Sequence, residues 1–121
     1  MSPSAVSKSA LVVDDEPGVR MCTADALLDM GFEVVEAGSA EEALRLIDAG
    51  AIPQVVITDH MMPGMSGSEL AAAILQRLPE AAVILVSGYA DVELAQGVRM
   101  LPKPFGLREL RQTVEQATAG R

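Results

Sequence analysis

Cysteine is nearly absent from this chain of 121 residues. Cys22 is its one cysteine, so an internal disulfide is excluded, and there is no Cys/His cluster of the kind that binds zinc. A chain of this length can bury most of its apolar surface in one core without disulfide or metal staples. Because the single cysteine leaves no internal disulfide, we expect the protein to belong to a reducing compartment.

Basic residues are also few. Nine Lys and Arg stand against 17 Asp and Glu, which makes the formal net charge −8 at pH 7. Proteins that bind nucleic acid in general do so largely through Lys and Arg that neutralise phosphates. The charge balance therefore argues against direct nucleic-acid binding.

Long apolar runs are missing as well. No run approaches the roughly 20 apolar residues that a membrane-spanning helix needs. Near the N-terminus, Asp14, Asp15 and Glu16 interrupt the chain before the apolar core of a signal peptide forms. We expect a soluble, cytoplasmic protein that does not insert into membranes.

Hydrophobic residues make up 50% of the chain, a content that excludes intrinsic disorder. The length matches one domain, and no linker, internal repeat or low-complexity tract divides it. We expect a single domain over residues 10–121, preceded by a disordered, Ser-rich lead-in at residues 1–9.

Short apolar runs typical of β-strands alternate with stretches of helical period. Strands are expected at residues 10–13, 33–37, 54–58, 82–86 and 99–101. Three of these runs are nearly continuous in apolar residues, as is typical of parallel strands covered by helices on both faces. The alternation predicts an α/β fold with a doubly wound, five-stranded parallel sheet.

Helix signals lie between these runs. The first helix is expected to bury a stripe and to end at Gly31; the stripe consists of Val19, Cys22, Ala26, Leu27 and Met30. Capping boxes, Ser39 with Glu42 and Ser66 with Glu69, predict two further helices, which end at Gly50 and Pro79. A last helix is expected to bury Leu107, Leu110, Val114 and Ala117. Residues 89–97 have room for about two helical turns, so a helix there is short.

Charged and hydroxyl residues follow four of the expected strands. Asp14 and Asp15 follow the first strand, Asp59 the third, Ser87 the fourth and Lys103 the fifth. The carboxyl ends of parallel strands meet at one edge of a sheet, where ligands bind. Three close carboxylates need a compensating cation, and hard oxygen ligands favour Mg²⁺. With Lys103, such a site suits a phosphoryl group.

Four motifs, in order and spacing, resemble the receiver domain of two-component response regulators, the CheY-like superfamily. They are LVVDDEP, ITDHMMPGMSG, VILVSGYA and LPKPF, and the resemblance extends from Ala10 to Ala117. It implies a flavodoxin-like sheet of order 2-1-3-4-5. It also implies a phosphoacceptor that catalyses its own phosphorylation and dephosphorylation, with a sensor histidine kinase or phosphotransfer protein as phosphodonor and an unknown output partner.

The resemblance implies a role for each site residue. Asp59 is the nucleophile that forms an acyl phosphate. Asp15 binds Mg²⁺ directly, Asp14 acts through water or by positioning, and the backbone carbonyl of Met61 completes the coordination. Ser87 donates a hydrogen bond to the phosphoryl group, and Lys103 pairs with it. A cis peptide joins Lys103 to Pro104 in this family, and the glycines of MPGMSG are expected at positive φ.

The chain departs from the family pattern in two ways. Met100 stands three residues before Lys103, where the family usually has the aromatic ring of its switch. Ser87 and Lys103 are only 16 positions apart, which again indicates a shortened fourth helix. We expect Tyr89 to screen the acyl phosphate from water. His60, which follows the nucleophile, is a weaker candidate for a phosphoacceptor or ligand.

Two alternative functions come from other classes. A pseudo-receiver would bind proteins without phosphorylation, but such a protein is expected to lose Asp59 or Lys103, and this chain retains both. A Mg²⁺-dependent phosphohydrolase would need a substrate pocket or a second acid, and the acidic surface repels polyanionic substrates. The residues therefore favour a phosphorelay receiver.

Overall fold

A computed structural model describes residues 8–88 and 97–119. Five strands, β1 (Ser9–Val13), β2 (Glu33–Ala37), β3 (Val55–Asp59), β4 (Ala82–Ser87) and β5 (Val98–Pro102), form one parallel sheet of order β2-β1-β3-β4-β5. The predicted fold and strand order are confirmed. Ser9 begins β1 and therefore does not belong to a lead-in, and residues 1–7 lie outside the described residues.

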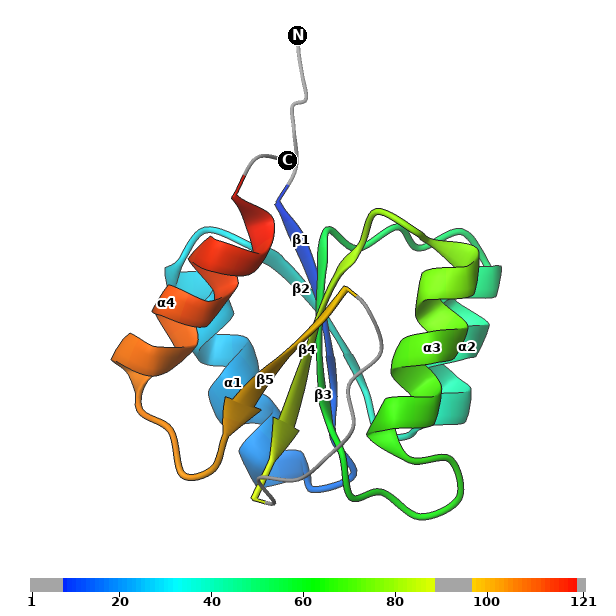
Figure 1. Ribbon diagram of the computed structural model, residues 1–121, viewed down its shortest axis with the longest axis horizontal. Helices are drawn as coiled ribbons and strands as arrows, with labels where there is room; N and C mark the ends of the chain where they lie inside the picture. Colours follow the sequence, from blue (N-terminus) through cyan, green and yellow to red (C-terminus); the bar gives the residue numbers. More distant parts are fainter. Residues whose placement is uncertain (1–7, 89–96, 120–121) are drawn as a thin grey trace, which may run out of the picture.

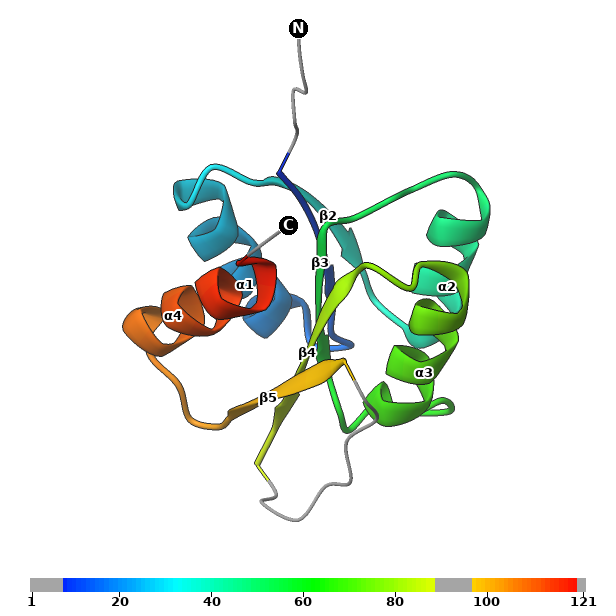
Figure 2. The same ribbon diagram turned by 45° about the horizontal axis from the view of Figure 1, so that its top comes forward.

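Four helices cover the sheet within the described residues: α1 (Pro17–Asp29), α2 (Ala40–Asp48), α3 (Gly67–Arg77) and α4 (Leu107–Thr118). Figures 1 and 2 show α1 and α4 on one face of the sheet, and α2 and α3 on the other. The shortened helix that we expect at residues 89–97 falls almost wholly outside the described residues.

Alternate residues of each inner strand belong to two separate hydrophobic cores, because successive side chains of a strand point to opposite faces of the sheet. On one face Val12, Ile57 and Ile84 pack with Leu27 of α1 and Leu110 of α4. On the other face Leu11, Val13, Val56 and Val83 pack against α2 and α3, including Ala43 and Leu70. The continuous apolar runs of the sequence are thus explained by burial on both faces.

Local signals set the helix ends. Ser66 and Glu69 form the predicted capping box at the start of α3. At α2, Ser39 accepts a hydrogen bond from the Glu42 amide, but the Glu42 carboxylate accepts from the amide of Gly38, so the reciprocal half of that box is wrong. Gly31 and Gly50 have φ of 95° and 118°, as expected for residues that follow a helix.

The inward face of α1 differs from the prediction. Thr23, Ala24 and Leu27 are its buried residues, whereas Cys22 is exposed and Val19 is 40% exposed. The other three residues of the predicted stripe do face the core: Leu27 is buried, and Ala26 and Met30 are partly buried against it. None of the helices described here has the length and apolar composition needed to cross a membrane.

Candidate functional site

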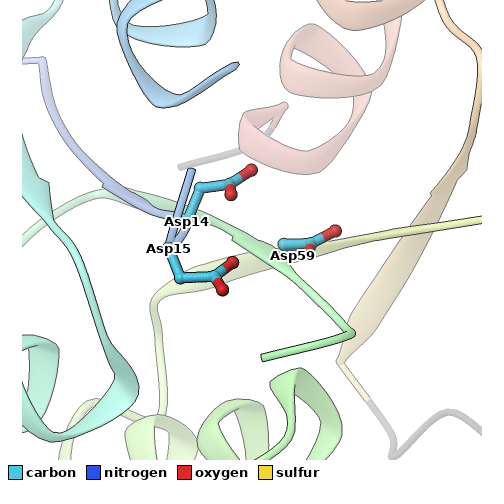
Figure 3. A group of neighbouring side chains, drawn as sticks. All are labelled: Asp14, Asp15 and Asp59. Atoms are coloured by element: carbon cyan, nitrogen blue, oxygen red, sulfur yellow. The ribbon is translucent and has the colours of Figure 1, made fainter. Parts of the chain in front are cut away.

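Three carboxylates lie together at the carboxyl edge of the sheet. Asp14 and Asp15 follow β1, and Asp59 is the last residue of the adjacent strand β3. One carboxylate oxygen from each lies within 4.8 Å of the others, and Figure 3 shows the three side chains side by side. The structure therefore brings together the acidic residues that the sequence predicted to meet.

Asp14 is the most constrained of the three. Its side chain is buried and its Oδ1 accepts a hydrogen bond of 2.9 Å from the amide of Glu16. Burial raises the pKa of Asp14 above its usual 3.8, and the nearby carboxylates of Asp59 and Asp15 add to this rise; the Glu16 amide and Lys103 oppose it. Asp14 thus carries its negative charge at a cost that a cation would relieve.

Lys103, directly after β5, places its Nζ 2.8 Å from Asp59 Oδ1. This hydrogen bond with Asp59 raises the pKa of Lys103 above its usual 10.5, against the opposing effect of burial. The lysine is therefore charged at neutral pH and pairs with the carboxylate that we predicted to be the nucleophile.

The ends of β4 and β5 are tied by a backbone hydrogen bond. The amide of Lys103 donates to the carbonyl of Ser87 over 2.8 Å, and the Ser87 side chain is buried. The peptide bond between Lys103 and Pro104 is cis, as the resemblance implied. Ser87 and Lys103 thus lie at the same edge as the carboxylates, each at a strand end.

The donor set fits a hard divalent cation. Three carboxylates carry −3 when ionised, and Lys103 supplies one positive charge, so the group retains a net negative charge. Its members are carboxylates without imidazole or thiolate, and carboxylate oxygens are the ligands that Mg²⁺ prefers. The arrangement would hold Mg²⁺ and leave positions for water or a phosphoryl oxygen.

The N-terminus of α3 anchors the backbone beside Asp59. The amide of Gly67 donates to the carbonyl of His60 over 2.9 Å, and the hydroxyl of Thr58 donates to the carbonyl of Asp59 over 3.0 Å. A methyl group on Gly67 would collide with the Asp59 carbonyl oxygen and lie 2.7 Å from the Cα atom of His60. Gly67 is therefore required for close approach.

The expectation of positive φ holds for one glycine of the MPGMSG motif and not for the other. Gly64 has a φ of 80°, whereas Gly67 opens α3 and is not among the positive-φ glycines of the described residues. At Gly67 the motif needs a glycine for the close approach of α3 to β3 and not for its turn geometry.

Three of the remaining predicted residues, His60, Met61 and Met100, fall within the described residues. The Nδ1 atom of His60 lies 3.3 Å from the Ser68 hydroxyl in the first turn of α3. Met61 is 61% exposed, and Met100 is a half-buried residue of β5. Tyr89 lies outside the described residues. The Met61 carbonyl as a ligand, and modulation by His60, Tyr89 or Met100, stay predictions.

An apolar groove of about 800 Å³ adjoins the site between α1 and the segment that joins β5 to α4. Val19 and Cys22 of α1 line the groove, as do Leu107 of α4 and Lys103. Val19, Cys22 and Leu107 are residues that we expected to be buried, and that expectation is wrong, since Leu107 is 72% exposed. The groove is their actual environment.

Known proteins share this sequence and architecture. The family described as response regulator receiver domain matches residues 10–115 of the chain. Sensor kinase CckA of Brucella abortus (strain 2308) is 37% identical over 117 residues, which cover 91% of this chain and 12% of the kinase. The chain therefore spans a small part of that relative's length.

Solved structures agree with this match. A response regulator receiver protein from Sinorhizobium medicae WSM419 superposes with a TM-score of 0.88 at 25% identity, covering 97% of this chain and 98% of that one. Response regulator TrrA of Thermotoga maritima, solved with Mg²⁺ and BeF, gives 0.80 at 34% identity, covering 91% and 98%. The chain belongs to the response regulator receiver domain family of two-component systems.

Proposed function

We propose that the chain is a phosphorelay receiver that accepts a phosphoryl group on Asp59 from a phosphohistidine of a sensor histidine kinase or phosphotransfer protein. The observation that carries the proposal is the placement of Lys103 Nζ 2.8 Å from Asp59 Oδ1 beside two further carboxylates. A carboxylate with a fixed cation at its oxygen and a divalent-ion site next to it suits phosphoryl transfer.

In this reaction an oxygen of Asp59 attacks phosphorus while the bond to the imidazole nitrogen breaks, and the bonding electron pair leaves with the imidazole. Mg²⁺ bound by Asp14, Asp15 and Asp59 would neutralise charge on the phosphoryl oxygens. Lys103 would exchange its bond with Asp59 for one with a phosphoryl oxygen. The buried hydroxyl of Ser87 would donate to another.

The phosphorylated state ends when water attacks phosphorus and releases phosphate from Asp59. The chain acts on itself in both steps, so it is a phosphoacceptor rather than an enzyme with a separate substrate. Movement of Lys103 and Ser87 toward the phosphoryl group would shift the tied ends of β4 and β5. This local change is the signal that we propose for an output partner.

The apolar groove supports a protein as phosphodonor. It extends from the exposed side chains of Val19 and Cys22 on α1 to Lys103, which contacts Asp59, so a partner bound there would lie next to the carboxylates. Exposed apolar residues grouped next to a charged site are typical of protein-binding surfaces. We propose that a helix of the phosphodonor protein packs in this groove.

Intact mass spectrometry tests the proposed function. The chain is incubated with acetyl phosphate, with Mg²⁺ or with a chelator, and the expected result is a phosphoryl adduct that forms only with Mg²⁺. Asp59→Asn is the control and is expected to stay unmodified. A Mg²⁺-independent adduct, or one that persists in Asp59→Asn, would contradict the proposal. No adduct on the native chain would favour the pseudo-receiver.

A further inference from the structure

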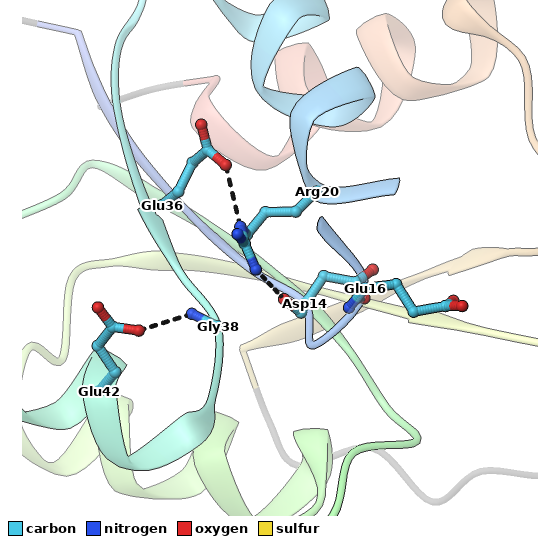
Figure 4. A network of polar contacts seen from close by, with 6 residues as sticks. All are labelled: Asp14, Glu16, Arg20, Glu36, Gly38 and Glu42. Atoms are coloured by element: carbon cyan, nitrogen blue, oxygen red, sulfur yellow. Dashed lines mark hydrogen bonds and ion pairs between the residues drawn. The ribbon is translucent and has the colours of Figure 1, made fainter. Parts of the chain in front are cut away.

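We propose that Arg20 is a positioning residue of the metal site, which it serves by bracing the backbone of Asp14 against β2. This inference rests on the proposed function, because it concerns the same carboxylates. Figure 4 shows Arg20 between Glu36 and the end of β1.

Arg20 makes two contacts in different directions. Its Nε donates to Glu36 Oε1 over 3.0 Å, and its Nη1 donates to the backbone carbonyl of Asp14 over 2.9 Å. The side chain of Arg20 is 20% exposed and that of Glu36 is 39% exposed, so the pair is partly shielded from water. Guanidinium donors in a planar fork can hold two such acceptors at once.

The neighbouring turn leaves space for this brace. A methyl group on Gly38 would lie 3.3 Å from Arg20 Nη1 and 3.6 Å from Glu42 Oε1. The Glu42 carboxylate in turn accepts from the Gly38 amide over 2.8 Å. A side chain at position 38 would therefore crowd the guanidinium that reaches Asp14.

The contact of Arg20 with the Asp14 carbonyl is one of three hydrogen bonds that restrain Asp14. The amide of Asp14 donates to the Ala37 carbonyl over 3.1 Å, its carbonyl accepts from Arg20, and its Oδ1 accepts from the Glu16 amide. The carboxylates of Asp14 and Asp15 stem from this segment. Partners behind a ligand orient it and raise metal affinity.

A positioning role and a pure charge role predict opposite results. The guanidinium is positive and lies against the residue that bears a site carboxylate, so by Coulomb's law alone it disfavours a bound cation. Removal of its charge would then tighten Mg²⁺ binding. If Arg20 instead holds the backbone in place, its removal weakens binding although it makes the site more negative. The sign of the change therefore separates the two roles.

The experiment compares Arg20→Gln, which removes the charge, with Arg20→Lys, which keeps it but lacks the planar fork. Mg²⁺ affinity of the unphosphorylated chain is measured by isothermal titration calorimetry, and Mn²⁺ affinity by the loss of the free-ion EPR signal. We expect both variants to bind each ion about tenfold more weakly. Native-like affinity of either variant, or tighter binding by Arg20→Gln, would overturn the inference.

Arg77, the last residue of α3, offers a matched control. Its Nε donates to Asp48 Oδ1 over 2.8 Å and its Nη1 to the Ala73 carbonyl over 3.1 Å, so it repeats the two kinds of contact that Arg20 makes. Arg77→Gln and Arg77→Lys are expected to bind both ions as the native chain does. Equal weakening in the Arg77 variants would show a general effect on folding and overturn the inference.

Phosphorylation by acetyl phosphate gives an independent readout. The Mg²⁺ concentration for half-maximal rate is expected to rise in both Arg20 variants, while the rate at saturating Mg²⁺ stays close to native. A lower saturating rate with an unchanged half-maximal concentration would contradict positioning of the metal ligands. A native chain that binds neither ion would defeat the proposed function itself, whereas native binding with unaffected Arg20 variants would defeat only this inference.

Discussion

Lys103 Nζ lies 2.8 Å from Asp59 Oδ1 and joins the loop after β5 to the end of β3. Because this ammonium lies at the proposed nucleophile, Lys103→Met is expected to slow phosphorylation by acetyl phosphate about 100-fold, the effect of losing one preorganised donor to a transition state. The rate of adduct formation by intact mass spectrometry measures this change.

Lys8 provides the control for that variant, because the chain has two lysines and Lys8 lies over the ring of Phe32 instead of at the site. Lys8→Met is expected to react at the native rate. An equal loss in both variants would contradict a specific role for Lys103.

Asp14→Asn is expected to stabilise the metal-free chain at pH 7. Burial raises the pKa of Asp14 in the fold above 3.8, so the folded chain binds this proton more tightly than the unfolded chain. The free energy of unfolding therefore falls as pH rises from 3.8 through the raised pKa. Asparagine removes the buried charge and keeps an oxygen for the Glu16 amide.

Urea unfolding in the presence of a chelator, measured across acidic to neutral pH, checks this expectation. The gain from Asp14→Asn should be present at pH 7 and shrink toward zero below pH 3.8, where both states hold the proton. A native chain more stable than Asp14→Asn at pH 7 without metal would refute it.

Gly67→Ala is expected to lower the free energy of unfolding by about 1–3 kcal/mol, the usual cost of overpacking. The new methyl group meets backbone atoms of Asp59 and His60, so α3 or the end of β3 has to move. Urea unfolding measures the loss. Gly18→Ala is the control, because its methyl group meets nothing within 4 Å; equal losses in both variants would contradict the close approach.

Mg²⁺ is expected to stabilise the folded chain. At a concentration 100 times its Kd the ion should add about 2.7 kcal/mol to the free energy of unfolding, because the unfolded chain lacks the assembled carboxylates. Asp15→Asn should lose most of this gain. Urea unfolding with MgCl₂, against NaCl at matched ionic strength, measures it. The same gain in Asp15→Asn would place the ion elsewhere.

Alkylation of Cys22 with a bulky maleimide is expected to slow phosphorylation by a protein donor at least about tenfold, a loss of 1.4 kcal/mol in transition-state binding. Cys22 is exposed in the wall of the apolar groove, so the added group fills the space proposed for the donor helix. Acetyl phosphate, which needs no groove, should react normally. Reagent-treated Cys22→Ser is the control, and unchanged protein-donor rates would exclude the groove.

The sequence predicted the sheet and the acidic cluster because both depend on short-range patterns. Apolar runs located every strand, and the position of Asp59 and Lys103 at strand ends determined which edge they share. The face of α1 could not be predicted in the same way. Apolar residues lie around more than one side of this helix, and burial depends on how closely the small Ala24 lets it approach the sheet.

Arg20 was missed for a related reason. Its partners come from the end of β1 and from β2, so its role exists only when the strands are assembled. Nothing in the local sequence separates it from a solvated arginine on a helix surface. The same holds for Gly67, whose motif was visible but whose requirement for close approach became clear only in three dimensions.

The backbone bond between the Lys103 amide and the Ser87 carbonyl has a consequence for how this protein can change. This bond holds the ends of β4 and β5 in register, so strand pairing sets the spacing of Ser87 and Lys103. We therefore expect the spacing of Ser87 and Lys103 to be kept when residues are inserted between β4 and β5, so that a reporter or a recognition element could be added there.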